Sequence, residues 1–484
     1  MTVSASRKQP RTAPGTKTRA TVAGVRLAPI VAIFLIALVI PFIFQIGPLR
    51  FSAYRVVLFL TILPFLAMWL MGRAGRVRMP DIALLLFCFW AALSFGVIHG
   101  AGTAIEAGGI IFIETMGAYL LGRLFVRTPD DLHRVVRLLF WILIALLPLA
   151  VIESITGRSI ALELSRAVQS SYRIVTMEPR WGFRRAQSVF EHPILFGVFC
   201  SGFVALTYYV LGHGRSLIRR WLQTGAVIVA TVTSLSSGPM TAMAAQVLLI
   251  GWDRVFKSVR QRWAVLGGLA LAGFAVISLF SNRSPAQILI SFVAFNPSTA
   301  WNRLRIWEHG SASVMNNPLF GIGRNDWERP MGMVSSVDMF WLLPAMRHGL
   351  LAGVLLQVVF FGIVLAVLFR KGLSARWADY RKGYLISLAG LFMAGWTVHY
   401  WNTVYVFFMF LLGCGSCFLT DARDADTATE PVTSAPVRRQ GLALRRTPAV
   451  KRPAEPDTPA EAANTDAARP QPRYSRPRRP PDET

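Results

Sequence analysis

The chain has 484 residues, of which 54% are hydrophobic and only 16% are charged. A soluble chain of this size carries nearer to about 25% charged residues, so the composition excludes an ordinary soluble protein and favours one that crosses a membrane several times. The formal net charge of +26 does not indicate a nucleic-acid partner, because the basic residues crowd short connectors and tails rather than a basic and aromatic stripe on a soluble module.

Apolar segments predict an all-α, polytopic membrane protein. Residues 1–26 are basic and rich in Ser, Thr, Pro and Gly, and we expect a disordered cytoplasmic arm. The run Leu27–Ile46 is too long for a signal-peptide core and lacks a small-residue cleavage site, so it is expected to be a retained anchor. The further expected spans are Tyr54–Met71, Ile82–His99, Thr103–Leu121, Val135–Ile155, Pro193–Leu211, Leu222–Leu235, Met240–Trp252, Ala264–Phe280, Asp338–Phe369, Tyr384–Tyr400 and Thr403–Leu419. About twelve transmembrane helices therefore fill a catalytic domain over residues 27–420.

Basic connectors indicate the orientation of these spans. The connectors at 72–79, 212–221, 253–263 and 370–382 are basic, and the connector at 123–134 is mixed. With the N-terminus in the cytoplasm, all of them lie on the cytoplasmic side, as the positive-inside rule expects. Residues 421–484 are rich in Pro, Ala, Thr, Arg and acidic residues, which predicts a disordered cytoplasmic tail. The four cysteines, Cys88, Cys200, Cys414 and Cys417, lie in apolar runs without nearby metal co-ligands, so we expect packing rather than a disulfide framework or a metal site.

Two long connectors, residues 156–192 and 282–337, are expected outside the cell and break the positive-inside rule. The first holds Arg158, Arg166, Arg173, Arg180, Arg184 and Arg185, and the second, with the segment after it, holds Arg303, Arg305, Arg324, Arg329 and Arg347. A broken local rule is where a functional site is expected. Guanidinium groups beside a bilayer need a partner, and a phosphate or pyrophosphate suits their geometry best. Alternatively, Arg303 and Arg305 pair with Glu308 or reach lipid phosphates, and Arg158, Arg166 and Arg173 face lipid headgroups.

The second connector contains a predicted interfacial helix, Thr299–Asn316. A helical pattern places Trp301, Leu304, Trp307 and Val314 on one face, opposite Arg303, Glu308 and Ser311. Asn317 and Pro318 end this helix, and Gly321 and Gly323 permit a tight turn that brings backbone N–H groups near a ligand. The next span starts at Asp338 and is broken by Pro344, with Arg347, His348 and Gly349 beyond. A broken span with ionisable residues is tolerated where it lines a polar cavity.

Ionisable residues near other spans have less specific interpretations. Glu106 and Glu153 lie near the outer ends of spans, where water can hydrate their carboxylates at little free-energy cost. Glu114 lies deeper, so a functional role and an inter-helix hydrogen bond both remain open. His99 and His399 lie at outer boundaries beside aromatic residues, which favours an interfacial belt.

Four short motifs occur in order between Val175 and Gly353. They read R-A-Q-S-V-F-E-H-P-I-L-F-G, S-L-S-S-G-P, R-L-R-I-W-E-H…N-N-P-L-F-G-I-G, and V-D-M-F-W-L-L…G-L-L-A-G. In order and spacing they resemble motifs of the bacterial O-antigen polymerase and ligase family, which includes exopolysaccharide polymerases. The second motif departs from the "S-R-G" element of that family, because Gly238 follows Ser237 directly and the usual Arg is missing.

The resemblance implies a metal-independent glycosyltransferase without a cofactor, multi-pass in the bacterial inner membrane, with both termini cytoplasmic and two periplasmic loops. Such enzymes move a saccharide from an undecaprenyl-pyrophosphate carrier to a sugar hydroxyl. By analogy, Arg185, with Arg184 close by, and Arg303 hold the pyrophosphate, and Arg305, Arg324 and Arg347 are further candidates. Membrane lipids and other polysaccharide assembly and chain-length proteins are the expected partners. Asp338 stands where the ligase branch has a His, which favours a polymerase over a lipid A-core ligase.

The chemistry also requires a base for the acceptor hydroxyl, and Asp338, Glu191 and His348 are the candidates, with Asp338 preferred. The alternatives are an O-antigen ligase and a lipid-linked oligosaccharide flippase or other transporter. A transporter is expected to concentrate ionisable groups at mid-membrane depth and to carry repeated halves, and neither is visible. A metal-dependent transferase usually has acidic residues in the first outside loop, and Gly47–Ser52 has none. A membrane scaffold would leave the arginines unexplained.

Overall fold

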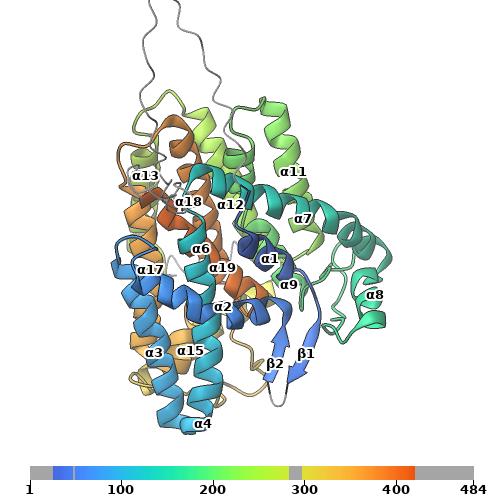
Figure 1. The fold of residues 1–484 in the computed structure, drawn as a ribbon, viewed down its shortest axis with the longest axis vertical. Coiled ribbons are helices and arrows are strands. Elements are labelled where there is room, and N and C mark those ends of the chain that lie inside the picture. The colour runs from blue at the N-terminus through green and yellow to red at the C-terminus, as the bar shows by residue number, and fades with distance from the viewer. Residues whose placement is uncertain (1–25, 47–48, 283–296, 420–484) are drawn as a thin grey trace, which may run out of the picture. The chain divides into compact units, whose positions relative to one another are not determined.

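The computed structural model describes residues 26–46, 49–282 and 297–419, so the expectations for the basic arm and the C-terminal tail lie outside the described residues. Of the described residues, 70% are helical and few are in strands (Figure 1). The first half contains α1 (Pro29–Ala37), β1 (Ile43–Ile46), β2 (Leu49–Ser52), α2 (Ala53–Leu70), α3 (Met79–His99), a helix of five parts, α4 (Ala101–Thr103), η1 (Ala104–Gly108), α5 (Gly109–Phe112), η2 (Ile113–Gly117) and α6 (Ala118–Phe125), and then α7 (Pro129–Thr156) and α8 (Ile160–Val168).

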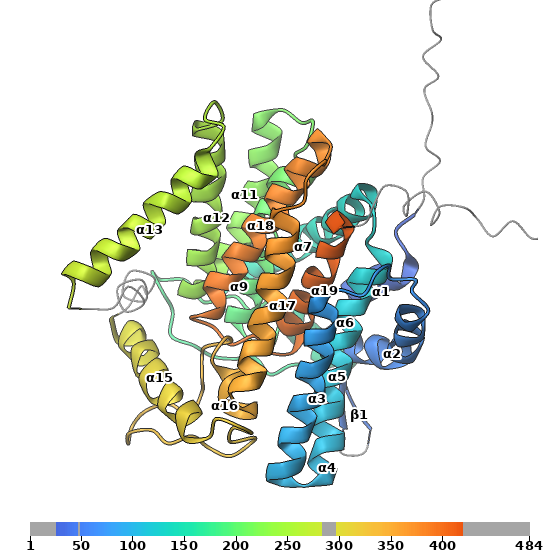
Figure 2. The same ribbon diagram turned by 90° about the vertical axis from the view of Figure 1, so that its left-hand side faces the viewer.

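The second half is helical throughout its described elements. It contains α9 (Pro193–Ser201), α10 (Val204–Leu206), η3 (Thr207–Leu211), α11 (Leu217–Thr233), α12 (Ser237–Val255), α13 (Arg262–Phe280), α15 (Pro297–Asn316), α16 (Leu343–His348), α17 (Leu350–Leu368), α18 (Ala375–Gly395), α19 (Asn402–Cys414) and η4 (Gly415–Leu419). Figure 2 shows α13 diverging from α12, and no residue of α13 is buried.

Local sequence determines where several of these helices begin. At α7, the Thr128 hydroxyl accepts the backbone N–H of Asp131, and the Asp131 carboxylate accepts the N–H of Thr128, which is a capping box. Pro129 follows at the first helical position, where a backbone N–H would have no acceptor within the helix. The long apolar helix therefore starts at a defined residue, and it ends at Thr156, because Gly157 adopts the left-handed conformation.

Within the described part of the chain, eight helices are long and apolar enough to cross a membrane: Ala53–Leu70, Met79–His99, Ala101–Phe125, Pro129–Thr156, Pro193–Leu211, Arg262–Phe280, Leu350–Leu368 and Asn402–Leu419. This agrees with the expected helical membrane protein. The other four expected spans contain the helices α1, α11, α12 and α18, which are shorter or more polar, so the count of twelve remains a prediction.

The first expected span, Leu27–Ile46, is not one helix. Its helix ends at Ala37, and Ile43–Ile46 forms β1, which pairs antiparallel with β2. Pro41 cannot continue the helix, because it lacks the N–H that the next turn needs. The N–H of Ile43 donates to the carbonyl of Ser170, so this hairpin contacts the first long connector.

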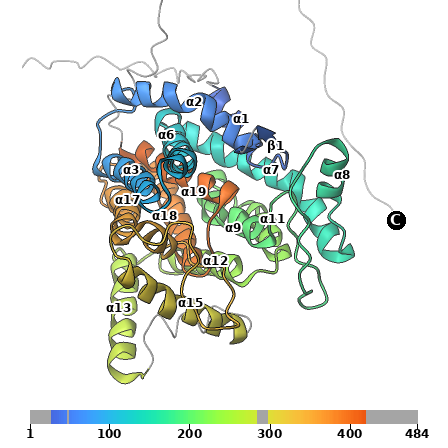
Figure 3. The ribbon, with the colours of Figure 1, turned by 90° about the horizontal axis from the view of Figure 1, so that it is seen from below.

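The core is centred on the segments Pro193–Leu211 and Asn402–Leu419, where 94% and 83% of the residues in an 18-residue apolar stretch are buried. Figure 3, viewed from one end, shows α9 and α19 inside, with α3, α7, α11, α12 and α17 around them. Helix α19 packs against α6, where Gly122 and Gly413 allow the two backbones to approach. Small residues at such crossings let helices pack closely where lipid provides no hydrophobic drive.

The broken span expected from Asp338 is present, but its break lies elsewhere. Pro344 stands in the first turn of α16, so it begins that helix rather than interrupting it. The break lies at Gly349, which has φ +84° and separates α16 from α17. A side chain there would overlap the carbonyl oxygen of Leu319, so the close approach of the second long connector requires glycine.

Candidate functional site

The end of the first long connector is held in place between two helix ends. The backbone N–H of Arg184 donates to the carbonyl of Ser154 in α7, and the N–H of Ala186 donates to the carbonyl of Thr233 in α11, each over 2.9 Å. The buried Gln187 side chain accepts the N–H of Val175 and donates to the carbonyls of Arg173 and Phe190. Residues 184–188 are therefore fixed before any ligand binds.

Glu153 completes this anchoring. Its carboxylate accepts the backbone N–H of Ser188 over 2.8 Å and the hydroxyl of Ser159. Glu153 is only 2% exposed, so the expectation that it is solvated at a span end is wrong. The carboxylate is buried because these two donors, drawn from the first connector, compensate for the lost hydration.

Three arginines from the two long connectors converge on three consecutive residues, 235–237, between α11 and α12. Arg180 donates from Nη1 to the carbonyl of Leu235 over 2.7 Å. Arg185 donates from Nη2 to the Ser236 hydroxyl over 2.9 Å. Arg303, on α15, donates from Nη2 to the Ser237 hydroxyl over 3.3 Å. We call Arg180, Arg185 and Arg303, with the turn that holds them, the arginine centre.

Positive charge in the arginine centre is poorly compensated. Arg185 and Arg303 are 6% and 7% exposed. Burial, and then the charge of Arg180, lowers the pKa of Arg185 to about 10. Burial also lowers the pKa of Arg303 to about 10, although the opposite charge of Asp338 works against that shift. Both guanidinium groups remain charged near neutral pH, so the centre attracts an anion.

Two donors of the arginine centre lack partners among the described residues. Nε of Arg185 and Nη1 of Arg303 are buried and donate to no atom of the residues that the structure describes. A buried donor without an acceptor costs roughly 1–3 kcal/mol. The two unmatched N–H groups are therefore suited to the oxygens of an anionic ligand, which would remove this cost.

The backbone around the arginine centre adopts left-handed conformations without glycine. Leu235, Ser188 and Trp181 have φ of +43°, +52° and +52°. Such residues cost of order 1–3 kcal/mol each, and they cluster at functional sites. Leu235 presents the carbonyl that binds Arg180, and Trp181 follows Arg180 directly, so the strained positions set the direction of the arginine side chains.

Asp338 connects the arginine centre to an adjacent cavity. Its carboxyl group interacts electrostatically with Arg303. Burial raises the pKa of Asp338 above its usual value, and the charge of Arg303 opposes this shift. Asp338 also lines a cavity of about 530 Å³, together with Arg324, Arg347, His399 and Trp401. The structure therefore places one candidate base between a buried arginine and a space that can admit a polar molecule.

The other two candidate bases lie outside this cavity lining. Glu191 accepts hydrogen bonds from Trp401 Nε1 over 3.1 Å and from Asn402 Nδ2 over 2.6 Å. His348 is 4% exposed and faces α3, where its ring lies 3.4 Å from the Ser94 hydroxyl and edge-on to Phe95. Asp338 is thus the one of the three that the structure places on the cavity.

The remaining candidate arginines lie beside α7, on α15 and in the lining of the cavity. Successive side chains of an extended segment point to opposite sides. Arg184 therefore points away from Arg185 and toward α7, where its charge acts on Glu153. Arg305 is half-buried on α15. Arg324 and Arg347 line the cavity with Asp338. The backbone N–H of Arg324 donates to Nε2 of His99 over 2.8 Å, so His99 binds the second connector as well as lying at a span end.

Helix α15 confirms the predicted helix but reverses part of its predicted faces. The buried residues are Arg303, Ile306, Gly310, Ser313 and Val314, whereas Trp301 is 64% exposed and Trp307 is 42% exposed. Arg303 belongs to the buried face because Ser237 and Asp338 provide a polar surrounding there. Arg303 makes these contacts in place of the alternative pairing with Glu308, and Trp307 packs edge-on against Trp396.

The backbone N–H groups of the glycine turn after α15 donate to carbonyls of the protein. Gly321 and Gly323 have φ of +68° and +62°, as a tight turn requires. The backbone N–H groups of Gly321, Ile322 and Gly323 donate to the carbonyls of Asn317, Met346 and Arg347. These bonds hold the second connector against α16, so these N–H groups have acceptors within the protein, and Ile322 and Gly323 also line the cavity beside Asp338.

Glu114 forms an inter-helix ion pair. Arg55 donates to its carboxylate from Nε over 2.9 Å and from Nη2 over 2.7 Å, and the same guanidinium group lies 3.4 Å from Asn402 Oδ1. Asn402 in turn binds Glu191. Of the two interpretations of Glu114, a functional role and an inter-helix hydrogen bond, the structure supports the inter-helix bond.

Sequence reasoning did not single out Arg180, Ser236 or Ser237 as site residues. Arg180 was one of six arginines in its connector, and its spacing from Arg185 does not show that both reach one turn. The run S-S-G-P between two apolar segments was a usable signal, because hydroxyl groups flanking a helix start offer acceptors beside a bilayer.

The described residues contain no group of three or more His, Cys, Asp or Glu placed to hold a metal ion. Comparison with known protein families and with curated proteins finds no match to this chain.

Proposed function

We propose that this chain is a glycan polymerase of the bacterial inner membrane, which transfers an oligosaccharide from an undecaprenyl-pyrophosphate carrier to a sugar hydroxyl at the periplasmic face. The observation that carries this proposal is the arginine centre. Three guanidinium groups from two separate connectors meet at one turn, two of them buried with unmatched donors. A pyrophosphate has the charge and the number of oxygens that such a centre can bind.

The arginine centre is suited to stabilise a departing pyrophosphate. The acceptor hydroxyl oxygen attacks the anomeric carbon of the lipid-linked sugar, and the bond from that carbon to the pyrophosphate oxygen breaks. The electron pair of the broken bond remains on the pyrophosphate, which leaves as undecaprenyl pyrophosphate. Fixed guanidinium donors bind this growing charge more strongly in the transition state than in the ground state, which accelerates the step.

Asp338 is the residue that we assign as general base. Its carboxylate takes the proton of the acceptor hydroxyl as the new glycosidic bond forms. It lines the cavity of about 530 Å³ that is large enough for a sugar, and Arg303 lies beside it. The acceptor then approaches through the cavity, while the carrier's pyrophosphate binds at the arginine centre.

The glycan lipids of cells that lack the protein test this function. A polymerase predicts single repeat units that accumulate on the outer leaflet, whereas a flippase predicts units trapped on the inner leaflet. Purified protein incubated with the lipid-linked repeat unit is expected to form longer chains and release the carrier. Transfer of preformed chains to a lipid A-core acceptor, without elongation, would indicate a ligase instead and would contradict the proposal.

A further inference from the structure

A second basic cavity lies at the opposite end of α3 from the candidate site. Helix α3 begins at this cavity with Met79 and ends at His99, which binds the second connector. Twenty-one residues of helix separate the two ends, a length of about 30 Å, close to the thickness of a bilayer's hydrocarbon core. The cavity has a volume of about 540 Å³ and is lined by residues of α3, α6, α17 and the end of α19 with η4.

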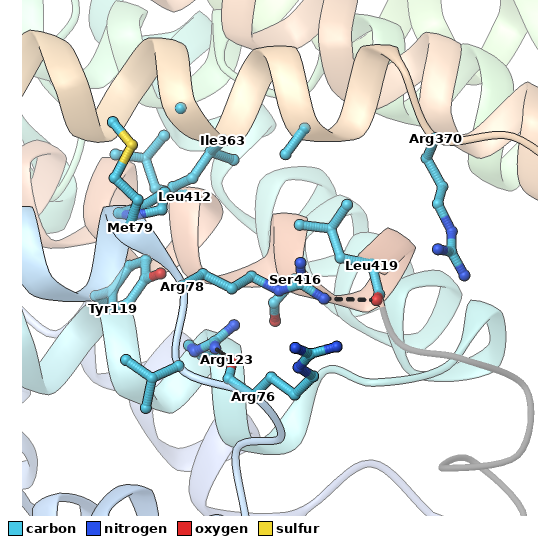
Figure 4. Close-up of a pocket in the computed structure, with 14 residues that line it drawn as sticks. Arg76, Arg78, Met79, Tyr119, Arg123, Ile363, Arg370, Leu412, Ser416 and Leu419 are labelled. Atoms are coloured by element: carbon cyan, nitrogen blue, oxygen red, sulfur yellow. Dashed lines mark hydrogen bonds between the residues drawn. The ribbon is translucent and has the colours of Figure 1, made fainter.

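One part of this cavity is basic and the other is apolar (Figure 4). Arg76, Arg78, Arg123 and Arg370 line the basic part, and Figure 4 shows the first three gathered near Ser416, with Arg370 on the opposite side. Met79, Pro80, Ile363, Ala366 and Leu412 line the apolar part. A ligand that fills both parts therefore has an anionic group joined to an apolar one.

Among the described residues, Asp81 is the carboxylate that contacts Arg78 and Arg123 in the basic part. Asp81 is fully buried and binds Arg123 over 2.7 Å. It also accepts the Tyr119 hydroxyl and the backbone N–H of Arg78, so its capacity is largely used. Figure 4 shows the Arg78 guanidinium directed at the carbonyl of Leu419, a bond of 2.7 Å.

Arg123 has an unmatched donor, and Arg78 is repelled by neighbouring arginines. Arg123 is 2% exposed, and its Nε is buried without a hydrogen-bond acceptor among the described residues. Burial lowers the pKa of Arg78 below its usual value, and the charges of Arg123 and Arg370 lower it further, against the opposing charge of Asp81. An additional anion in the cavity would relieve this repulsion.

We propose that this cavity is a specific binding site for an anionic glycerophospholipid, with the headgroup phosphate among Arg76, Arg78, Arg123 and Arg370 and the first part of an acyl chain along Met79, Ile363 and Leu412. Basic pockets between transmembrane helices bind anionic lipid headgroups. The surrounding helices α3 and α17 are long and apolar enough to cross a membrane, so a lipid of the adjacent leaflet can reach the cavity from the side. This inference does not depend on the catalytic proposal.

The test uses the full-length protein, purified in a zwitterionic detergent and stripped of lipid. Native mass spectrometry measures its binding of phosphatidylglycerol, with phosphatidylcholine as the zwitterionic control lipid. The variant R76Q/R370Q removes two charges from the cavity, and K257Q/R260Q removes two from the exposed connector between α12 and α13, where both residues lie outside the cavity. We expect one saturable phosphatidylglycerol site that is weakened tenfold or more in R76Q/R370Q and unchanged in K257Q/R260Q.

Thermal unfolding provides a second measurement that does not depend on detecting the adduct. Phosphatidylglycerol should raise the unfolding temperature of the natural chain and of K257Q/R260Q, but not that of R76Q/R370Q. Equal loss of binding in both variants would show bulk charge attraction and overturn the proposal. Equal binding of phosphatidylcholine would overturn it as well. Displacement of the lipid by millimolar inorganic phosphate would assign the cavity to a free anion rather than to a lipid.

Discussion

Arg303 illustrates how a single charged residue can define a site. It comes from a helix that looks interfacial by sequence, yet its guanidinium group is buried against Ser237 and beside Asp338. A guanidinium group is planar and presents several fixed donors, whereas an ammonium group is a compact point charge. Geometry, as well as charge, should therefore matter at this position.

Replacing Arg303 by Lys should separate the two effects. The charge survives but the planar fork does not, so we expect transfer activity to fall about a hundredfold or more while the protein still inserts and folds. Transfer from a purified lipid-linked repeat unit measures activity, and size-exclusion profiles of the extracted protein measure folding. Arg158→Lys is the matched control, because that side chain is 74% exposed and pairs with Glu163. Full activity in Arg303→Lys would disprove bidentate binding by Arg303.

Asp338 should determine how activity depends on pH. The base must be deprotonated, and burial raises the pKa of Asp338 above that of an ordinary aspartic acid. As pH falls through this raised pKa, the carboxylate gains a proton and kcat/KM should decline, at a higher pH than an ordinary aspartate would cause.

Two variants identify the residue whose protonation causes this acid limb of the pH profile. Asp338→Asn should reduce kcat about 10²–10⁴-fold and abolish the limb. Glu191→Gln should keep it, because Glu191 is occupied by Trp401 and Asn402 rather than placed on the cavity. A limb that vanishes in Glu191→Gln and persists in Asp338→Asn would reverse the assignment.

At the scale of elements, the decisive feature is a short hairpin in the first long connector. Arg180 and Phe183 exchange two backbone hydrogen bonds of 2.9 Å around Trp181 and Gly182. Both central residues have positive φ, as a tight two-residue hairpin turn of the mirror type requires. Asn is the residue that such a turn favours at the first central position, and Trp is unusual there. Trp181 is 65% exposed and adjoins the arginine centre.

Trp181→Asn should therefore change binding without weakening the fold. We expect thermal stability to stay equal or rise by about 1 kcal/mol, because Asn tolerates the left-handed conformation better. We also expect KM for the lipid-linked saccharide to rise about tenfold with little change in kcat, because an exposed indole offers a flat apolar face to a sugar ring. Differential scanning fluorimetry and steady-state kinetics measure the two effects. A lower unfolding temperature with unchanged KM would show that Trp181 is only structural.

At the scale of the whole molecule, the proposed function requires one orientation of the protein in the membrane. The arginine centre must face the periplasm and the basic connectors must face the cytoplasm. The four natural cysteines are buried and reduced, so single introduced cysteines can report the side of the membrane with little background.

Cysteines placed in the two kinds of connector should label from opposite sides. We expect Arg158→Cys to react with a membrane-impermeant maleimide in spheroplasts. Lys257→Cys should react only after the membrane is opened, although both positions are exposed in the fold. The inverse pattern would place the arginine centre in the cytoplasm and rule out a periplasmic transfer reaction.

Much of this protein follows from its amino-acid sequence alone. The apolar runs, such as Pro193–Leu211 and Asn402–Leu419, determine a helical membrane protein, because backbone groups in lipid must be bonded within each segment. The excess of arginine in two long connectors indicates where an anion site is expected. Asp338 also follows from sequence as a candidate, because it opens a segment that cannot be one regular span.

Only the tertiary structure decided which of these residues act together. Arg184 and Arg185 are neighbours in sequence, yet one turns to α7 and the other to Ser236. Arg180 and Arg303 are 123 positions apart by number, yet both reach residues 235–237. The helical pattern placed Arg303 on a polar face, and the fold buries it. Periodicity describes the average environment of a face, whereas a buried charge depends on the particular acceptors and counter-charges that other segments bring to it.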